Sequence, residues 1–255
     1  MQGLNAAVFG FASTRSLAWG IASAWAAAGA RVSVGIQSER FQGALEAATA
    51  AWPVPPHIVV CDVSEEASLA SAFAALAQHH GGCLHALAHS IAHAPSQAMR
   101  APLLQTSRSD FLAAHSVSAY SLLAMARLAA PLMPLPAGGS ILALSYLGAT
   151  RAAPSYRVMG PAKASLEACA RGLAAELGPQ GIRVNVLSVG PVNTLAARGI
   201  ADFQALSQHA AARAPLGRGV TLQEVGQAAV LLGSPAGSGI TGQTLYVDAG
   251  FSAVV

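Results

Sequence analysis

A tyrosine and a lysine spaced seven residues apart are the side chains of this sequence best suited to chemistry. Tyr156 and Lys163 lie in the run SYLGATRAAPSYRVMGPAKASLEA. Seven residues is close to twice the helical repeat, so on a continuous helix both side chains share one face. A lysine beside a tyrosine favours the phenolate and strengthens the hydroxyl as a donor to a developing oxyanion. A buried core tyrosine and a surface lysine are the structural alternatives.

A proline between these two residues limits where their helix can begin. Pro161 cannot donate a backbone hydrogen bond and clashes with the preceding turn inside a helix, but it is harmless in the first turn. We therefore expect the regular helix to begin near Gly160, with Tyr156 in the turn that leads into it.

A turn near the N-terminus has the residues needed to approach phosphates. Gly10 ends an apolar run, small residues follow, and Ser16 and Leu17 precede Gly20. Backbone N–H groups and a helix N-terminus would face a pyrophosphate there, with the Ser16 hydroxyl as a further contact. The spacing also fits an ordinary tight turn between a strand and a helix.

The residue at the end of the second apolar run bears on the choice of dinucleotide. NAD enzymes often carry an acidic residue there and NADP enzymes arginines, whereas this chain has Gln37. Gln37 resembles the residue at this position in NADH-using reductases, so NADH is the expected cofactor. Arg15 and Arg40 could still reach a 2′-phosphate, which leaves NADPH as an alternative.

The elements that must position these residues alternate along the chain. Seven short runs, most of them without polar alternation, read as strands buried on both faces, and Ala-rich helical stretches separate them. The expected strands are 6–10, 31–36, 57–62, 83–90, 140–145, 182–189 and 244–248. This order predicts an α/β fold, a single-domain Rossmann-like doubly wound parallel sheet over residues 1–255.

The stretch from Pro191 to Val220 has no strand signal and follows the end of a strand, where ligands bind in open α/β sheets. Long loops in compact domains are usually functional. We interpret it as a lid over the substrate; an irregular surface excursion is the alternative.

Composition excludes several classes of function. A net charge of +3 without a basic stripe gives nucleic-acid binding little support. No apolar run reaches the roughly eighteen residues of a membrane span, and no signal peptide is evident, so we expect a cytoplasmic protein that does not enter the membrane. The cysteines and histidines show no metal-ligand spacing, so no metal site is expected. Charged residues make up only 10% of the chain, which fits either a surface covered by other subunits or an Ala-rich composition bias.

These motifs together resemble one family. The order of Gly10, Ser16, Ala18 and Gly20, and the positions of Tyr146, Tyr156, Met159 and Lys163, are similar to those of the FabI-type enoyl-acyl-carrier-protein reductases that use NADH. This family is a divergent branch of the short-chain dehydrogenase/reductase superfamily. It reduces the carbon–carbon double bond of trans-2-enoyl thioesters in fatty acid synthesis.

The resemblance implies a role for each matching residue. Tyr156 would donate to the thioester carbonyl oxygen, Lys163 would bind the nicotinamide ribose and support the enolate, and Tyr146 would belong to the same catalytic pocket. The implied cofactor-binding residues are Gly10, Ser16, Leu17, Gln37, Asp62, Val63, Ser90, Ile91, Ala92, Lys163, Val192 and Thr194. The implied substrate-binding residues are Ala94, Tyr146, Tyr156, Met159, Ala196, Ile200 and Phe203. The implied partners are an acyl-carrier-protein-bound enoyl thioester and other copies of the chain in a homotetramer, for which the Ala-rich helix at 162–177 suits close packing.

The chain departs from the family pattern at a few positions. Ala92 replaces a glycine beside the adenosine ribose, His93 an aromatic residue near the substrate, Ser116 an aspartate, and Ala249 a glycine near the C-terminus. Two alternatives therefore stay open. One is a paralogue that reduces another enone or a carbonyl, and the other is a nucleotide-binding subunit without catalysis.

Overall fold

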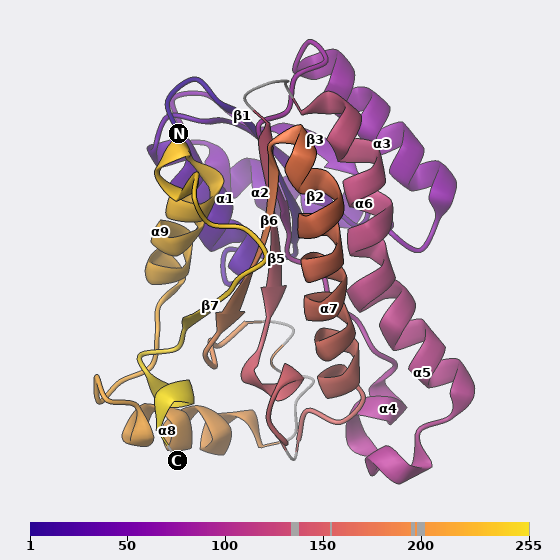
Figure 1. The fold of residues 1–255 in the computed structure, drawn as a ribbon, viewed down its shortest axis with the longest axis vertical. Coiled ribbons are helices and arrows are strands. Elements are labelled where there is room, and N and C mark those ends of the chain that lie inside the picture. Colours follow the sequence, from indigo (N-terminus) through magenta and orange to yellow (C-terminus); the bar gives the residue numbers. More distant parts are fainter. Residues whose placement is uncertain (134–137, 154, 195–196, 198–201, 255) are drawn as a thin grey trace.

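Seven parallel strands form one sheet in the order β3-β2-β1-β4-β5-β6-β7, with helices on both faces (Figure 1). The structure is a computed structural model that describes residues 1–133, 138–153, 155–194, 197 and 202–254. The strands are β1 Asn5–Phe11, β2 Arg31–Ile36, β3 His57–Val60, β4 Ala86–His89, β5 Gly139–Ser145, β6 Ile182–Val189 and β7 Thr244–Val247. The order reverses between β1 and β4, as in doubly wound sheets, so the predicted fold class is confirmed.

Two hydrophobic layers hold the helices against the sheet. Helices α1 (Leu17–Ala27) and α9 (Leu222–Gly233) pack on one face, in the layer that contains Ile21, Trp25 and Leu232. Helices α3 (Glu66–His79), α6 (Ser121–Ala129) and α7 (Met159–Leu177) cover the other face. Because both faces are covered, the central strands carry continuous apolar residues rather than an alternating pattern.

Helices α1 and α9 approach closely because glycines face each other. A Cβ added to Gly20 would lie 2.7 Å from the Leu222 carbonyl oxygen, and one added to Gly226 would lie 2.5 Å from the Gly20 carbonyl oxygen. Contacts this short do not occur between real Cβ atoms and backbone, so the absence of side chains permits the packing. Close packing of α1 against α9 therefore requires a glycine at position 20, independently of any role of Gly20 in phosphate binding.

Most predicted strand bounds agree with the structure to within two residues. The strand predicted over 83–90 is too long, because β4 covers only Ala86–His89. The Cys83 carbonyl accepts a hydrogen bond from the Asn5 side chain, 2.8 Å away, instead of pairing along the ladder. Side-chain capping of this kind is not visible in the apolar pattern that suggested the longer strand.

A long helical stretch crosses the α3 side of the sheet. Helix α5 (Arg108–His115) continues through a π-helical segment, Ser116–Tyr120, into α6. An 18-residue window within Arg108–Leu132 has a mean hydropathy of 1.2 and is long enough to span a membrane, which the reading of the sequence for apolar runs did not find. Leu122 and Met125 in α6 are fully buried against α3 and α7, and core helices of globular proteins meet the same length and composition test.

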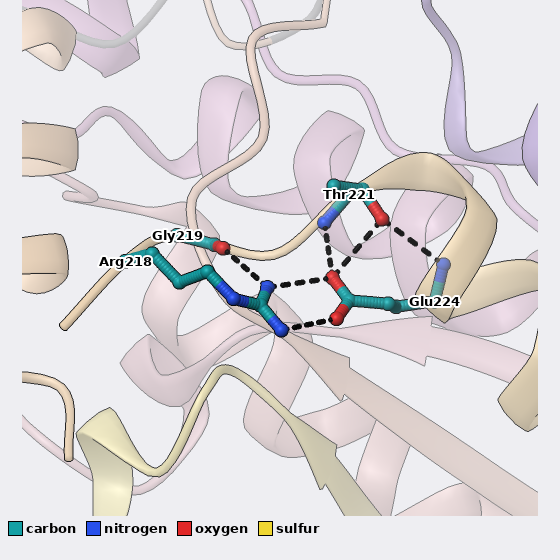
Figure 2. A network of polar contacts seen from close by, with 4 residues as sticks. All are labelled: Arg218, Gly219, Thr221 and Glu224. Carbon is teal, nitrogen blue, oxygen red and sulfur yellow. Dashed lines mark hydrogen bonds and ion pairs between the residues drawn. The ribbon is translucent and has the colours of Figure 1, made fainter. Parts of the chain in front are cut away.

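The connection from β6 to α9 contains helix α8 (Phe203–Arg213), and no strand is described within it. Its far end is fixed by polar contacts (Figure 2). Thr221 caps α9 in a capping box with Glu224, and Arg218 pairs with that carboxylate at 2.7 Å. These contacts lower the pKa of Glu224 to about 2, first through the hydrogen bond from Arg218. The connection therefore enters α9 at a defined position.

Candidate active site

A cavity of about 760 Å³ opens where the strands end at their carboxyl edges. This volume lies within the usual range for small-molecule and cofactor sites. Every predicted cofactor-binding residue lines it: Gly10, Ser16, Leu17, Gln37, Asp62, Val63, Ser90, Ile91, Ala92, Lys163, Val192 and Thr194. The predicted substrate residues Ala94, Tyr146, Tyr156, Met159 and Phe203 also line it, whereas Ala196 and Ile200 lie outside the described residues.

The end of the cavity near β1 is built around Gly10. Its φ of +104° lies in the region that favours glycine, and an added Cβ would lie 2.1 Å from the Ser90 carbonyl oxygen. Ser16 caps α1 by accepting a hydrogen bond from the Trp19 backbone at 3.2 Å, and its hydroxyl donates to the Ser13 carbonyl at 2.7 Å. The hydroxyl is already engaged, so the backbone N–H groups of the first turn are the better anion donors.

Gln37 and Asp62 are joined across the ends of β2 and β3. The Gln37 amide donates to the Asp62 carboxylate at 3.1 Å, and the Arg40 guanidinium donates to the Gln37 carbonyl at 3.4 Å. Ser64 also donates to Asp62, through its hydroxyl at 2.6 Å and its backbone at 3.0 Å. The hydrogen bonds from Ser64 are the main cause of the lowered pKa of Asp62, so this side of the cavity carries a carboxylate.

Tyr156 and Lys163 reach the cavity from different local structures. Helix α7 begins at Met159, so Tyr156 lies in the turn before it and Pro161 falls in the first helical turn, as predicted. The expectation that both share one helical face does not apply, because Tyr156 is not helical. The next residue, Arg157, has a φ of +47°, so the backbone is left-handed between Tyr156 and the start of α7.

The Tyr156 ring is held by its neighbours. It packs edge-on against Tyr146, with ring centroids 4.7 Å apart at 62°. Gly148 makes room for it, because an added Cβ there would lie 2.4 Å from Tyr156 Cδ1. No described residue hydrogen-bonds the Tyr156 hydroxyl, so it can donate to a ligand in the cavity.

The expected shift toward phenolate is wrong for this arrangement. Burial raises the pKa of Tyr156 well above its usual value, and the negative charges that Tyr146 and Glu167 can carry raise it further. Burial also raises the pKa of Tyr146. Both phenols therefore stay protonated at neutral pH, which suits donation of a hydrogen bond rather than general-base chemistry.

Lys163 is almost fully enclosed at the base of the cavity. Its ammonium donates to the Leu144 carbonyl at 2.7 Å and to the Ile91 carbonyl at 3.3 Å. An ammonium has three N–H donors, so described residues leave one for a ligand. Burial lowers the pKa of Lys163 to about 8, while Glu167 on the same helix raises it.

Comparison with known protein families identifies the family to which this chain belongs. The sequence model described as "Enoyl-(Acyl carrier protein) reductase" matches residues 10–252 of this chain. The chain belongs to the enoyl-acyl-carrier-protein reductase family. The resemblance drawn from the sequence is thereby confirmed.

Individual relatives match over nearly their whole length. Relatives named "enoyl-[acyl-carrier-protein] reductase [NADH]" share 42% identity in Bacillus subtilis and 45% in Neisseria meningitidis, and each alignment covers at least 98% of this chain and 96% of the relative. The Bacillus cereus reductase solved with NADP+ and an indole naphthyridinone superimposes with a TM-score of 0.96 at 40% identity, covering 100% of this chain and 98% of that chain. The Anaplasma phagocytophilum reductase solved with NAD gives 0.93 at 41%, with 100% and 95% covered.

A dinucleotide fits the residues that this reductase-family chain presents. At one end of the cavity the N-terminus of α1 can bind phosphates. At the other end the third N–H of Lys163 can donate to a hydroxyl of the ligand. Ala92 is exposed at the cavity wall and does not have a positive φ. The methyl group of Ala92, which stands where the resemblance implies a glycine, therefore causes no backbone strain, and a ligand that approaches this wall would meet it.

His93 and Met159 are tied together on the substrate side. Ser118, in the π-helical segment, accepts from the His93 backbone N–H and donates to its carbonyl, both at 2.9 Å, and lies 3.8 Å from the Met159 sulfur. Met159 and His93 line the cavity. The π-helical segment, which the sequence did not predict, thus shapes this wall, as such bulges often do at functional sites.

The other histidines near the site make internal contacts. His89 is fully buried with Nε2 at 2.7 Å from the Ser121 hydroxyl, and His115 bonds the Phe111 carbonyl through Nδ1 at 2.9 Å. Burial lowers the pKa of His89 to about 3, so it is neutral. Among described residues, no cluster of three or more histidine, cysteine or acidic groups could hold a metal ion.

Several residues of the cavity wall were not predicted from the sequence. Cys61 has its thiol pKa raised to about 12 by burial, so it is not a nucleophile there. Other unpredicted positions contribute apolar or basic side chains from elements without a motif, among them Phe41, Met99, Arg100, Val117 and Leu206. Only their placement in the fold, which no local pattern encodes, brings them to the site.

Proposed function

We propose that this protein reduces the carbon–carbon double bond of trans-2-enoyl-acyl-carrier-protein thioesters in fatty acid synthesis, with NADH as the reductant. The observation that carries the proposal is a protonated, half-buried Tyr156 with its hydroxyl free, in one cavity with a buried Lys163 that keeps one N–H donor. The names of the relatives, which specify enoyl-acyl-carrier-protein reductase and NADH, support the reaction class and cofactor.

The nucleotide would lie along the carboxyl ends of the strands, from Asp62 after β3 to Val192 after β6. Backbone N–H groups of the α1 first turn and Thr194 would hold the pyrophosphate, and Asp62 and Val63 would hold the adenine. Ser90, Ile91 and Ala92 would lie against its ribose, Lys163 would bind the nicotinamide ribose, and the Val192 backbone would bind the amide. The Asp62 carboxylate bonded to Gln37 disfavours a 2′-phosphate nearby, which supports NADH over NADPH. When bound, the nicotinamide supplies a hydride.

The protein's own groups would stabilise the charge that appears on the substrate. Tyr156 would donate to the thioester carbonyl oxygen, where negative charge develops as the alkene is reduced. Lys163 adds a positive charge at the base of the same cavity. Tyr146 supports the Tyr156 ring through its edge contact, and Met159 and Phe203 would contact the acyl chain.

The proposal extends to the organisation of the chain. Residues 1–255 would act as one reductase domain, and 191–220, with α8 in its middle, as a lid over the acyl chain. A homotetramer is supported by the solvent-facing surface of α7, where Ala168, Gly172 and Ala175 are exposed small residues that permit close helix packing. We place the enzyme in the cytoplasm, acting on carrier-bound substrates.

The test is an assay of purified protein with NADH and crotonyl or longer enoyl thioesters, followed by the loss of absorbance of the reduced cofactor. Oxidation with enoyl thioesters supports the proposal, and the same rate with NADPH would contradict the cofactor assignment. Oxidation only with ketones would indicate the carbonyl-reducing paralogue. Binding of NADH without turnover on any substrate would indicate a non-catalytic subunit.

A further inference from the structure

A buried carboxylate one helical turn beyond Lys163 has no role in the chemistry described above. Glu167 lies on the same face of α7 as Lys163, since residues four apart are neighbours on a helix. Its side chain is only 5% exposed. Buried carboxylates are rare unless they are paired, so this one requires an explanation.

Glu167 is fixed to the strand that carries the catalytic wall. The Ser145 hydroxyl, at the end of β5, donates to the Glu167 carboxylate at 2.5 Å. Ser145 directly precedes Tyr146, and Leu144, the residue before Ser145, provides the carbonyl that accepts from Lys163 at 2.7 Å. The carboxylate and the ammonium are therefore anchored to two consecutive residues at the end of β5, Ser145 and Leu144.

The other titratable groups around Lys163 are uncharged. They come from three different elements: His89 on β4, Tyr146 after β5 and Tyr156 before α7. Burial holds the pKa of His89 at about 3 and raises the pKa of both tyrosines, so each is neutral at pH 7. Among the described residues, Glu167 is thus the group left to balance the charge of Lys163 in this part of the interior.

We propose that Glu167 is a positioning residue that keeps the buried Lys163 ammonium protonated at neutral pH. A buried ammonium loses its hydration, and an opposite charge close by restores the preference for the charged form. The inference deepens the proposed function and rests on it only for the consequence in catalysis. The charge state of Lys163 itself can be measured without substrate.

The sequence offers a direct reporter, because Lys163 is the only lysine in the chain. Protein labelled with [13C]lysine, with no lysine in any affinity tag, gives one side-chain Cε resonance to follow against pH. We expect a midpoint near pH 8 in the wild type, as the lowered pKa of about 8 indicates. In Glu167→Gln, which keeps the size of the side chain and one oxygen that can accept from Ser145, the midpoint should fall by about one pH unit or more.

Two further variants keep the test sharp. Glu176→Gln removes a carboxylate from the exposed face of the same helix, so its titration should match the wild type. Glu167→Asp keeps the charge, so the midpoint of its lysine titration should stay close to that of the wild type. This variant tests the proposal even if Glu167→Gln folds poorly. An unchanged midpoint in Glu167→Gln, or the same fall in Glu167→Asp and Glu167→Gln, would overturn the proposal.

The pH profile of kcat/KM separates this inference from the proposed function. The alkaline limb in Glu167→Gln should move to lower pH by the shift seen for the lysine resonance. If the resonance shifts and the limb does not, Glu167 sets the charge as inferred, but the role given to Lys163 in reduction fails. A limb that moves while the resonance stays in place would instead refute the inference about Glu167.

Discussion

The packing of Gly148 against the Tyr156 ring allows the position of the phenol to be tested without removing it. A Cβ on Gly148 would lie 2.4 Å from Tyr156 Cδ1, 3.1 Å from Cε1 and 3.2 Å from Tyr146 Cδ1. Carbon atoms pack best at about 3.5–4.0 Å, so in Gly148→Ala the ring must retreat by about 1 Å. A displacement of about 1 Å at a reacting group can cost roughly 10²-fold in rate. We expect kcat to fall by about that factor, with a loss of about 1–3 kcal/mol in the free energy of unfolding from overpacking.

The assay combines NADH oxidation with enoyl thioester, NADH binding by fluorescence and urea unfolding. Binding of NADH should change little, because Gly148 does not line the cavity. Gly43→Ala on α2 (Gln42–Thr49) is the matched control, since nothing lies within 4 Å of its added Cβ, and it should stabilise the helix by about 0.5–1 kcal/mol with normal turnover. Wild-type turnover and stability in Gly148→Ala would refute the reasoning, because the ring could not then lie where the contact places it.

Two stability predictions follow from the backbone and from burial. Ala249 has a φ of +58°, a conformation that costs a residue with a side chain roughly 1 kcal/mol. Ala249→Gly should therefore raise the free energy of unfolding in urea by about 0.5–1 kcal/mol. An unchanged or lower value would contradict this. Burial lowers the pKa of His80 from 6.5 to about 4, and its ring bonds Ser33 at 2.8 Å. The folded state then binds fewer protons than the unfolded state, so stability is fully present above pH 6.5 and is lost as pH falls toward 4, by up to about 3 kcal/mol from the difference of 2.5 units. Urea unfolding between pH 7 and 4.5 should show a shallower pH slope in His80→Gln than in the wild type, and equal slopes would exclude this origin.

The fold could be predicted largely from the sequence because its signals are local. Apolar runs such as 31–36 and 182–189 coincide with β2 and β6, because strands buried on both faces carry continuous apolar residues that can be seen in the sequence itself. The helix start at Met159 followed from the chemistry of Pro161, which is tolerated only in the first turn. Strand ends set by side-chain contacts, as at Cys83, gave no such signal.

The candidate site was predicted as far as short motifs reach. Gly10, Asp62 and Ser90 lie at strand ends, and parallel strands bring their carboxyl ends to one edge of the sheet. Protonation states could not be read in this way, because burial decides them, and the sequence alone suggested a phenolate at Tyr156 where burial favours the phenol. The role of Glu167 depends on contacts between α7 and β5, which no spacing in the chain reveals.

The central claim is that a protonated Tyr156 and a charged Lys163 act on one substrate in one cavity. Its most direct test compares Tyr156→Phe and Lys163→Ala in kcat with an enoyl thioester and in the Kd for NADH. Loss of a hydrogen bond to a developing oxyanion typically costs about 10²–10³-fold, so Tyr156→Phe should lose that much kcat with little change in Kd, while Lys163→Ala should impair both. Turnover close to the wild type in both variants would contradict the account.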